Sequence, residues 1–377
     1  MIIPRYIENR IQNVLVSDLY PAVIIFGARQ VGKTTLLKQL IKQTKLPNRF
    51  FACDDPSVVD IFQGFNIDRL KRLIGSNKLL IFDEAQTIPD IGLLLKLIID
   101  YIPDVKLFVS GSSSFELANQ LSEPLTGRKI TFLLYPIALS ELYKTDQLIE
   151  VRAELSRYLR FGFYPKIFQF KEDSEIELYL NEISRDYLYK DAIQLQLIKN
   201  NEPMRRLITS LALQIGQEVS YTELSRTVGI DQKTVIRYVD LLEKSFIVFK
   251  LPAFSRNQRN EINKSRKIYF YDLGIRNALI KNFNEPILRS DIGPLWENFL
   301  IMERIKNDSA KGLVKNYYFW RNYAKQEIDW IEEYSGELHG YEFKWKSGKI
   351  KANDFLESYP GSTVQKITQD NFENFIW

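Results

Sequence analysis

The sequence predicts an α/β protein in which a parallel sheet with helices on both faces is followed by a helical region and a second, smaller α/β region. Short apolar segments near residues 22, 50, 79, 106 and 130 alternate with helical patterns, as in parallel strands joined by crossover helices. Residues 140–200 show mainly helical periodicity. In the last third, charged and apolar residues alternate along two strand-like segments.

The composition is that of a globular chain with more than one hydrophobic core. Its 377 residues are 45% hydrophobic, and the single cysteine and single histidine exclude a disulfide framework and a Cys/His metal site. The net charge of +4 is too small to indicate nucleic acid by itself. The N-terminus lacks a signal peptide's long apolar core, and the apolar stretch 91–102 is interrupted by Lys96 and Asp100. We therefore expect a cytoplasmic protein with no membrane partner.

The first apolar segment, Ala22–Phe26, leads into a complete Walker A loop and then into an amphipathic helix that continues from Thr35. The loop residues are Gly27, Ala28, Arg29, Gln30, Val31, Gly32, Lys33 and Thr34. The glycines let backbone N–H groups surround a diphosphate, Lys33 reaches the β and γ oxygens, and the Thr34 hydroxyl is a ligand for Mg²⁺. The positive end of the helix dipole also attracts phosphate. We therefore expect residues 27–35 to bind a nucleoside triphosphate with Mg²⁺.

A Walker B strand follows at Leu79–Phe82 and ends in two carboxylates, Asp83 and Glu84. We expect Asp83 to hold Mg²⁺ through its water shell and Glu84 to orient or deprotonate the attacking water. A glutamate at this position favours ATP hydrolysis over a GTPase-like switch. The predicted cofactors are therefore ATP and Mg²⁺.

Two further residues are candidates for contact with the γ-phosphate. Ser112 follows the apolar strand Val105–Ser110 and is predicted to sense the γ-phosphate, whereas the serines after it are better explained as caps of the next helix. Arg128 follows Gly127 before the strand Ile130–Leu134. Arg128 either stabilises transition-state charge, within one chain or from a neighbouring copy in a homo-oligomer, or is a solvated turn residue. The sequence leaves these alternatives open.

These motifs together resemble a large family of bacterial and archaeal AAA-superfamily ATPases. The resemblance rests on the Walker A loop with its following leucines, on Leu79–Gln86, on the Gly111–Ser113 turn and on Leu125–Arg128. Three later segments resemble that family's C-terminal half, a domain long labelled as of unknown function: Phe161–Pro165, Tyr269–Gly274 and Gly293–Phe299. The resemblance implies an ATPase domain, helices with a winged helix, and a nuclease-like fold. The family's second glycine after Gly162 is Phe163 here.

A helix-turn-helix is predicted at residues 221–238, with Gly229 in the turn and Asp231 as the N-cap of the second helix. Four apolar residues of that helix are expected to face the core: Val235, Ile236, Val239 and Leu242. Lys233 and Arg237 then point outward, either into a DNA groove or as the surface of a structural joint. The stretch 256–267, with five cations including Arg266 and Lys267, is expected to be a loop that either follows phosphates or is simply solvated.

A second chemical site is predicted near the C-terminus. Asp329, thirteen residues before Glu342, and the following Lys344 have the spacing of the PD-(D/E)XK nuclease core, which the resemblance also implies. In that chemistry, carboxylates hold Mg²⁺ and the lysine orients water or offsets phosphate charge. Glu297, on a predicted helix, is a candidate for a further metal-binding carboxylate.

The predicted domains are an AAA-type P-loop ATPase domain (1–139), a helical lid or linker (140–200), a winged helix (201–255) and a PD-(D/E)XK nuclease-like domain (256–377). Two functions remain open. One is an ATPase that couples hydrolysis to DNA binding or processing through Asp329, Glu342 and Lys344. The other is a nucleotide-switched regulator or scaffold whose C-terminal domain binds nucleic acid or protein without cleavage.

Overall fold

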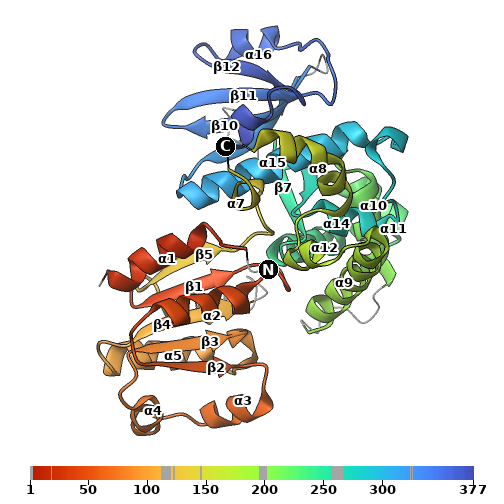
Figure 1. The fold of residues 1–377 in the computed structure, drawn as a ribbon. Coiled ribbons are helices and arrows are strands. Elements are labelled where there is room, and N and C mark those ends of the chain that lie inside the picture. The colour runs from red at the N-terminus through yellow and green to blue at the C-terminus, as the bar shows by residue number, and fades with distance from the viewer. Residues whose placement is uncertain are drawn as a thin grey trace. The chain divides into compact units, whose positions relative to one another are not determined.

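A computed structural model describes residues 3–17, 19–111, 120–121, 124–144, 147–194, 202–255, 266–322, 324 and 326–377 (Figure 1). The chain divides into two compact units. The first contains Met1–Pro136 with Lys244–Phe246, and the second contains Ile137–Glu243 with Ile247–Trp377. Each unit is built around its own buried apolar side chains.

The first unit is built on a five-stranded parallel sheet with strand order β2-β3-β4-β1-β5. The strands are β1 (Ala22–Phe26), β2 (Asn48–Ala52), β3 (Leu79–Asp83), β4 (Lys106–Gly111) and β5 (Lys129–Leu133). The predicted parallel sheet is confirmed. Because β4 lies between β1 and β3, the ends of all three strands reach one edge of the sheet together.

Helices cover both faces of this sheet (Figure 1). They are α1 (Ile7–Val16), α2 (Lys33–Gln43), α3 (Pro56–Phe62), α4 (Ile67–Ile74) and α5 (Ile91–Tyr101), with the short η1 (Ala85–Thr87). The connection from β1 to β2 runs across the sheet in the direction opposite to those from β2 to β3 and from β3 to β4. Since crossovers are right-handed, this reversal puts α2 on one face and α4 and α5 on the other.

The second unit begins with helices, and two motifs of the sequence, at 161–165 and 269–274, contact each other within it. Its helices include α7 (Leu139–Leu142), α8 (Leu148–Phe161), η2 (Pro165–Gln169), α9 (Asp173–Gln194), α14 (Leu273–Leu279), η3 (Pro286–Leu288) and α15 (Ile292–Lys311). Gly162, at φ 68°, ends α8, and a Cβ there would lie 2.3 Å from Asp272 Oδ1. The N–H of Phe163 donates to Asp272 Oδ2 at 2.6 Å, and Asp272 also caps α14. The segments 161–165 and 269–274 therefore form one buried joint.

A three-helix segment with a small antiparallel sheet follows within the second unit. It contains α10 (Glu202–Leu213), β6 (Glu218–Val219), α11 (Tyr221–Val228), α12 (Gln232–Lys244), β7 (Val248–Pro252) and β8 (Arg266–Phe270), and β8 is the central strand. Gly229 takes φ 78° in the predicted turn, and Asp231 Oδ1 accepts from the N–H of Thr234 at 3.0 Å as the predicted cap. Ile236 is 37% exposed, contrary to expectation, because Tyr238 takes the inward position.

The C-terminal part of the second unit is a four-stranded mixed sheet with order β12-β11-β10-β9. Its elements are β9 (Asn316–Arg321), β10 (Glu327–Tyr334), β11 (Glu337–Phe343), α16 (Asn353–Ser358), β12 (Thr363–Ile367) and α17 (Glu373–Ile376). β10 and β11 are antiparallel neighbours, with Trp330 opposite Tyr341, and β11 and β12 are parallel. The two charged strands of the sequence therefore pair directly.

Candidate functional site

The Walker A loop has the backbone geometry that its glycines permit. Gly32 adopts φ 103°, and Gln30 adopts φ 57°, a left-handed conformation that is uncommon without glycine. A Cβ on Gly27 would lie 2.3 Å from the carbonyl oxygen of Leu134, so only glycine fits there. The side chains of Ala28 and Val31 are buried, whereas Thr35 is exposed. These loop residues therefore contribute through their backbone.

Lys33 lies inside this loop with its ammonium on backbone oxygens. Its side chain is 2% exposed, and Nζ donates to the carbonyls of Gly27 at 3.1 Å and Ala28 at 3.0 Å. The same Nζ lies 3.5 Å from Glu84 Oε1. The Walker A cation and the Walker B carboxylate are therefore in one site.

The two predicted magnesium ligands contact each other. The Thr34 hydroxyl donates to Asp83 Oδ2 at 2.6 Å. Ser110, near the end of β4, donates its hydroxyl to Asp83 Oδ1 and accepts the N–H of Glu84 at 3.1 Å. No motif of the sequence indicates Ser110, because its contact with Asp83 depends on the position of β4 between β1 and β3. Ser112, the predicted sensor, lies outside the described residues.

Glu84 is held in an unusual backbone conformation by its surroundings. Its φ is 54°, and the side chain is 27% exposed. Gln86 Nε2 donates to Glu84 Oε2 at 2.7 Å. A non-glycine residue in the left-handed region costs about 1–3 kcal/mol and is concentrated at functional sites. The strained backbone directs the Glu84 carboxylate toward Lys33.

Arg5 is a second residue at the Walker A loop that no sequence motif indicates. Its guanidinium donates to the carbonyl of Val31 at 3.1 Å and to that of Tyr135 at 2.6 Å, and the residue is 9% exposed. Arg5 thus joins the N-terminal segment to the Walker A loop. The sequence gives no signal for this contact, because Arg5 is far from both partners along the chain.

Arg128 lies at the wrong edge of the sheet for a role within its own chain. It comes directly before β5, whose Lys129 is opposite Ala22 at the start of β1, whereas the Walker A loop follows the end of β1. The two edges are roughly 15 Å apart along the strands. Arg128 pairs with Asp100 on the surface, and its side chain is 43% exposed. The within-chain role is therefore wrong, and a role across a subunit boundary stays a prediction.

The residues of the predicted C-terminal site come together. Asp329 Oδ2 accepts the N–H of Phe343 at 2.8 Å, which joins β10 to β11. Glu342 Oε2 is 2.7 Å from Lys344 Nζ. Glu297, on α15, reaches the same cluster because it and Asp329 both contact Lys267.

Lys267 was expected in a loop that either follows phosphates or is simply solvated, and the expectation of a loop is wrong. The residue lies in β8 and its side chain is 3% exposed. Its Nζ is 3.0 Å from Glu297 Oε1, 2.5 Å from Glu327 Oε1 and 3.8 Å from Asp329 Oδ1. The Tyr269 hydroxyl also donates to Glu297. Most other cations of the stretch 256–267 lie outside the described residues.

Burial dominates the electrostatics of this cluster. It raises the pKa of Glu297 to about 7 against the opposing effect of Lys267. Burial, together with Asp329, also raises the pKa of Glu342 to about 7, and burial raises the pKa of Asp329. Burial works against the charged form of Lys267, but Glu297 and its neighbours outweigh it and raise the pKa of the ammonium. Lys267 is therefore a permanent cation among the carboxylates.

The donor set does not fit the predicted metal at this place. Across the described ranges, no three His, Cys, Asp or Glu side chains are arranged to share a metal ion. The predicted set Glu297, Asp329 and Glu342 fails because the Lys267 ammonium lies against Glu297 and close to Asp329. At the Walker motifs, by contrast, Thr34 and Asp83 are adjacent oxygen donors that fit Mg²⁺ once phosphates supply further ligands.

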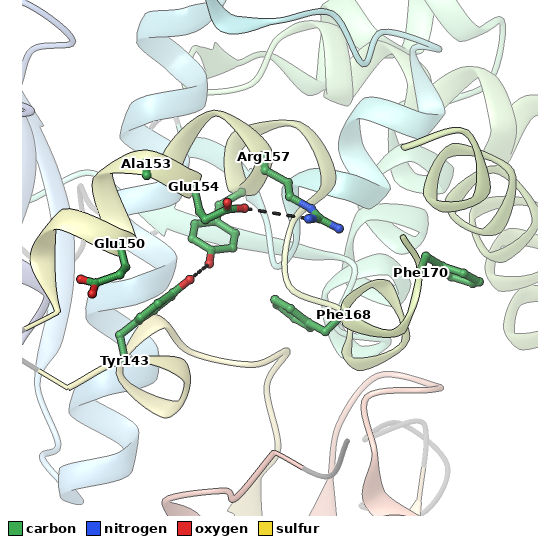
Figure 2. A pocket seen from close by; sticks show the side chains of 8 residues that line it. Tyr143, Glu150, Ala153, Glu154, Arg157, Phe168 and Phe170 are labelled. Carbon is green, nitrogen blue, oxygen red and sulfur yellow. Dashed lines mark hydrogen bonds and ion pairs between the residues drawn. The ribbon is translucent and has the colours of Figure 1, made fainter. Parts of the chain in front are cut away.

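A separate pocket of ≈ 490 Å³ lies in the helical part of the second unit (Figure 2). Its lining residues are Tyr143, Glu150, Ala153, Glu154, Arg157, Tyr158, Phe168 and Phe170. The hydroxyls of Tyr143 and Tyr158 are 2.6 Å apart, and Arg157 lies 3.9 Å from Glu154. Figure 2 shows Tyr143 and Glu150 at one end and Phe168 and Phe170 at the other. None of these residues belongs to the predicted sites.

Family models match three parts of the chain. A model described as an AAA domain matches residues 19–143, and two described as domains of unknown function, DUF8612 and DUF4143, match residues 152–286 and 292–365. The chain therefore carries an AAA ATPase domain that binds nucleotide, with two further domains after it. In the described part of the chain, every helix is too short or too polar to cross a membrane.

Similar proteins come from bacteria and archaea. The uncharacterized protein MJ1637 of Methanocaldococcus jannaschii is 26% identical over 74% of this chain and 64% of its own length. The Walker-type ATPase PABY2304 of Pyrococcus abyssi has a similar fold, with a TM-score of 0.50 and 15% identity over 74% of this chain and 96% of that structure. The uncharacterized protein Rv2008c of Mycobacterium tuberculosis is 30% identical over 86% of this chain and 70% of its own length. The chain belongs to the family of AAA-domain proteins that includes Rv2008c.

Proposed function

We propose that the first unit hydrolyses ATP with Mg²⁺ at the Walker motifs. The observation that carries this proposal is the 2.6 Å contact between the Thr34 hydroxyl and Asp83 Oδ2. These groups come from α2 and β3, which meet only in the folded chain. Thr34 and Asp83 would hold Mg²⁺, which would offset the negative charge of the phosphates.

The other residues of the site have distinct roles in this proposal. Lys33 exchanges its two backbone carbonyls for phosphate oxygens, because a charge-assisted hydrogen bond is stronger than one to a neutral carbonyl. Glu84 orients and deprotonates the attacking water, and Gln86 fixes the direction of its carboxylate. Ser110 holds Asp83 in place.

Phosphate release by the purified chain tests this proposal. We expect hydrolysis of ATP with Mg²⁺, none with EDTA, and loss of hydrolysis in Asp83→Asn. Asp104→Asn is the matched control, since Asp104 is exposed and its only described ion pair is with Lys78 at 3.6 Å. Equal rates for Asp83→Asn and the parent chain would refute the assignment.

We also propose that the second unit contacts nucleic acid through α12. Lys233 and Arg237 are exposed on one face of this helix, which Asp231 caps. The order α10, β6, α11, α12, β7, β8, with three antiparallel strands, supports a winged helix in this segment. Outward cations on the second helix of such a motif contact a DNA groove.

DNA binding measured by fluorescence anisotropy over a range of salt concentrations tests this second proposal. We expect Lys233→Ala with Arg237→Ala to weaken binding and to reduce its salt dependence, because two cations that offset phosphate charge in the groove are lost. Arg205→Ala, which removes a cation paired with Glu202 on α10, is the control. Equal affinity and salt dependence in both variants would favour a protein partner for this face.

The C-terminal sheet supports a nuclease-like fold, because α15, β9, β10, β11, α16 and β12 follow in the order of that fold's core. Two roles were open for it: cleavage at Asp329, Glu342 and Lys344, or binding without cleavage. The position of Lys267 favours binding without cleavage.

A further inference from the structure

The carboxylate cluster of the second unit contains its own cation. The Lys267 ammonium is within hydrogen-bond distance of Glu297 and Glu327 and lies 3.8 Å from Asp329. The ring of Phe319, with its centroid 5.6 Å from Nζ, lies against another side. These groups come from β8, α15, β10 and β9, so the lysine is at a meeting point of four elements.

This lysine cannot easily leave the cluster. β8 is the central strand of its sheet, and Lys267 is paired with Glu218 of β6 on one side and Leu251 of β7 on the other. The backbone is therefore fixed on both sides, and the side chain is 3% exposed. A buried ammonium without carboxylate partners would be very costly, which keeps Nζ where it is.

The ammonium occupies space that a metal ion would need. Divalent cations bind carboxylate oxygens at ~2.0–2.6 Å. A cation at the same oxygens would lie within a few ångströms of the Nζ that already contacts Glu297 and Glu327, and like charges at that distance repel strongly. The remaining carboxylate of the predicted set, Glu342, is already paired with Lys344 at 2.7 Å.

We propose that Lys267 takes the place of a divalent cation in this nuclease-like site. The cluster is then an internal ion pair that does not cleave phosphodiesters. While Lys267 lies among them, the described carboxylates are not arranged to share a metal ion. Removing the ammonium lets Glu297, Glu327 and Asp329 close around a divalent cation. This inference concerns residues of the second unit and does not depend on ATP hydrolysis in the first.

Mn²⁺ binding to the nucleotide-free full chain, measured by electron paramagnetic resonance, tests the proposal. We expect Lys267→Met to gain one Mn²⁺ site that is at least about tenfold tighter than any site in the parent chain, a gain that Lys267→Met/Asp329→Asn lacks. Lys250→Met is the matched control. Lys250 lies on the neighbouring strand β7 and pairs with two carboxylates, at 2.6 Å from Asp240 and 2.7 Å from Glu243.

Two results would overturn the proposal. One is a Lys267→Met chain with native circular dichroism and unchanged ATP hydrolysis that gains no Mn²⁺ site. The other is Mn²⁺ binding, or Mn²⁺-dependent cleavage of labelled DNA, by the parent chain that Asp329→Asn abolishes. The second measurement needs no lysine variant, so it decides the question even if Lys267→Met does not fold. ATP hydrolysis is followed in parallel, and its absence would count against the first proposal alone.

Discussion

Two buried lysines of this chain stand beside carboxylates but differ in what holds them. Lys33 donates to two backbone carbonyls and lies 3.5 Å from the carboxylate of Glu84. Lys267 has two carboxylates within 3.0 Å and a third at 3.8 Å. Both side chains are almost fully buried. The fixed charge around each lysine therefore distinguishes them, whereas burial does not.

This difference determines whether the lysine can bind an incoming anionic ligand. A hydrogen bond to a neutral carbonyl is roughly half as strong as a charge-assisted one, so Lys33 gains by moving to phosphate. Lys267 would have to leave several carboxylates in a buried place, at a cost of several kcal/mol. The first lysine is available for an incoming anion, and the second is part of the structure.

The largest effect on ATP binding and hydrolysis is expected from substitution of Lys33. Lys33→Ala should lower ATP binding and hydrolysis by about 10³-fold or more, because the main electrostatic partner of the β and γ phosphates is lost. Phosphate release and nucleotide binding by fluorescence measure this. Lys38→Ala, an exposed lysine on the same helix, should stay close to the parent chain. A similar loss in both variants would mean that helix charge in general, and not Lys33, attracts the nucleotide.

A slightly smaller effect is expected at the carboxylate beside Lys33. Glu84→Gln should lower the rate of hydrolysis by about 10²–10⁴-fold while ATP remains bound, since general-base catalysis is lost and phosphate contacts remain. Single-turnover hydrolysis and nucleotide retention on the protein separate the two quantities. If the variant hydrolyses ATP at the parental rate, Glu84 is not the base. Gln86→Ala should give an intermediate rate, because the carboxylate is present but less well directed.

Substitution of Lys267 should change the stability of the fold and leave ATP hydrolysis unchanged. Lys267→Met leaves the largely buried carboxylates of Glu297 and Asp329 without their cation and should lower the free energy of unfolding by about 3 kcal/mol at neutral pH. Chemical denaturation in metal-free buffer measures the loss, and added Mn²⁺ should restore part of it. Lys250→Met, at a half-buried ion pair, should lose less. Equal losses would remove the distinction that we draw for Lys267.

The sequence predicts the Walker residues of the first site because their chemistry is local. Each of the two motifs of this site is one continuous segment with a fixed spacing. The first is the strand, loop and helix around Lys33, and the second is the Walker B strand that ends in Asp83 and Glu84. Arg5 and Ser110 reach the site through contacts between distant segments, which no spacing indicates. The contact of Ser110 with Asp83 depends on the strand order β3-β4-β1, which is a property of the whole sheet.

At the second site, likewise, the residues close together in the sequence could be predicted, and the residue placed by long-range contacts could not. Asp329 in β10, Glu342 in β11 and Lys344 directly after β11 lie close together in the sequence, so their spacing and the family resemblance together predicted them. Lys267 lies in a cation-rich stretch that is typical of a solvated loop. Its burial depends on pairing of β8 with both β6 and β7 and on packing against α15 and β10. The residue that changes the chemistry of the site is thus the one fixed by long-range packing.

In a third ion cluster, one carboxylate is surrounded by two cations, whereas at Lys267 one cation is surrounded by three carboxylates. Asp291 accepts from two arginines, at 2.5 Å from Arg276 and 2.9 Å from Arg289, and its pKa is lowered to about 2. A lowered pKa means that the stabilisation is complete above the ordinary value of 3.8 and is lost as the pH falls toward 2. The loss should be about 2 kcal/mol. Denaturant unfolding at pH 6 and pH 2.5 should show a smaller difference for Asp291→Asn than for the parent chain.

Asp173→Asn, which removes a half-exposed carboxylate 2.9 Å from Arg160, is the control for this pH dependence. It should leave the difference between pH 6 and pH 2.5 nearly unchanged. An Asp291→Asn chain with the full parental difference would show that other carboxylates account for the acid sensitivity.

The smallest effect is expected at Arg128, a cation with one exposed partner at the sheet edge opposite the Walker A loop. Its pair with Asp100 is worth about 0.5 kcal/mol, so Arg128→Ala should hardly change stability. Within one chain it cannot reach the nucleotide, and hydrolysis should therefore stay within about twofold of the parent chain. The remaining way for Arg128 to act is from a neighbouring copy. Mixing Arg128→Ala chains with Lys33→Ala chains tests this role. Recovered hydrolysis in a mixed oligomer would mean that each copy supplies the residue that the other lacks. If hydrolysis is not recovered, Arg128 is a surface residue without a role in catalysis.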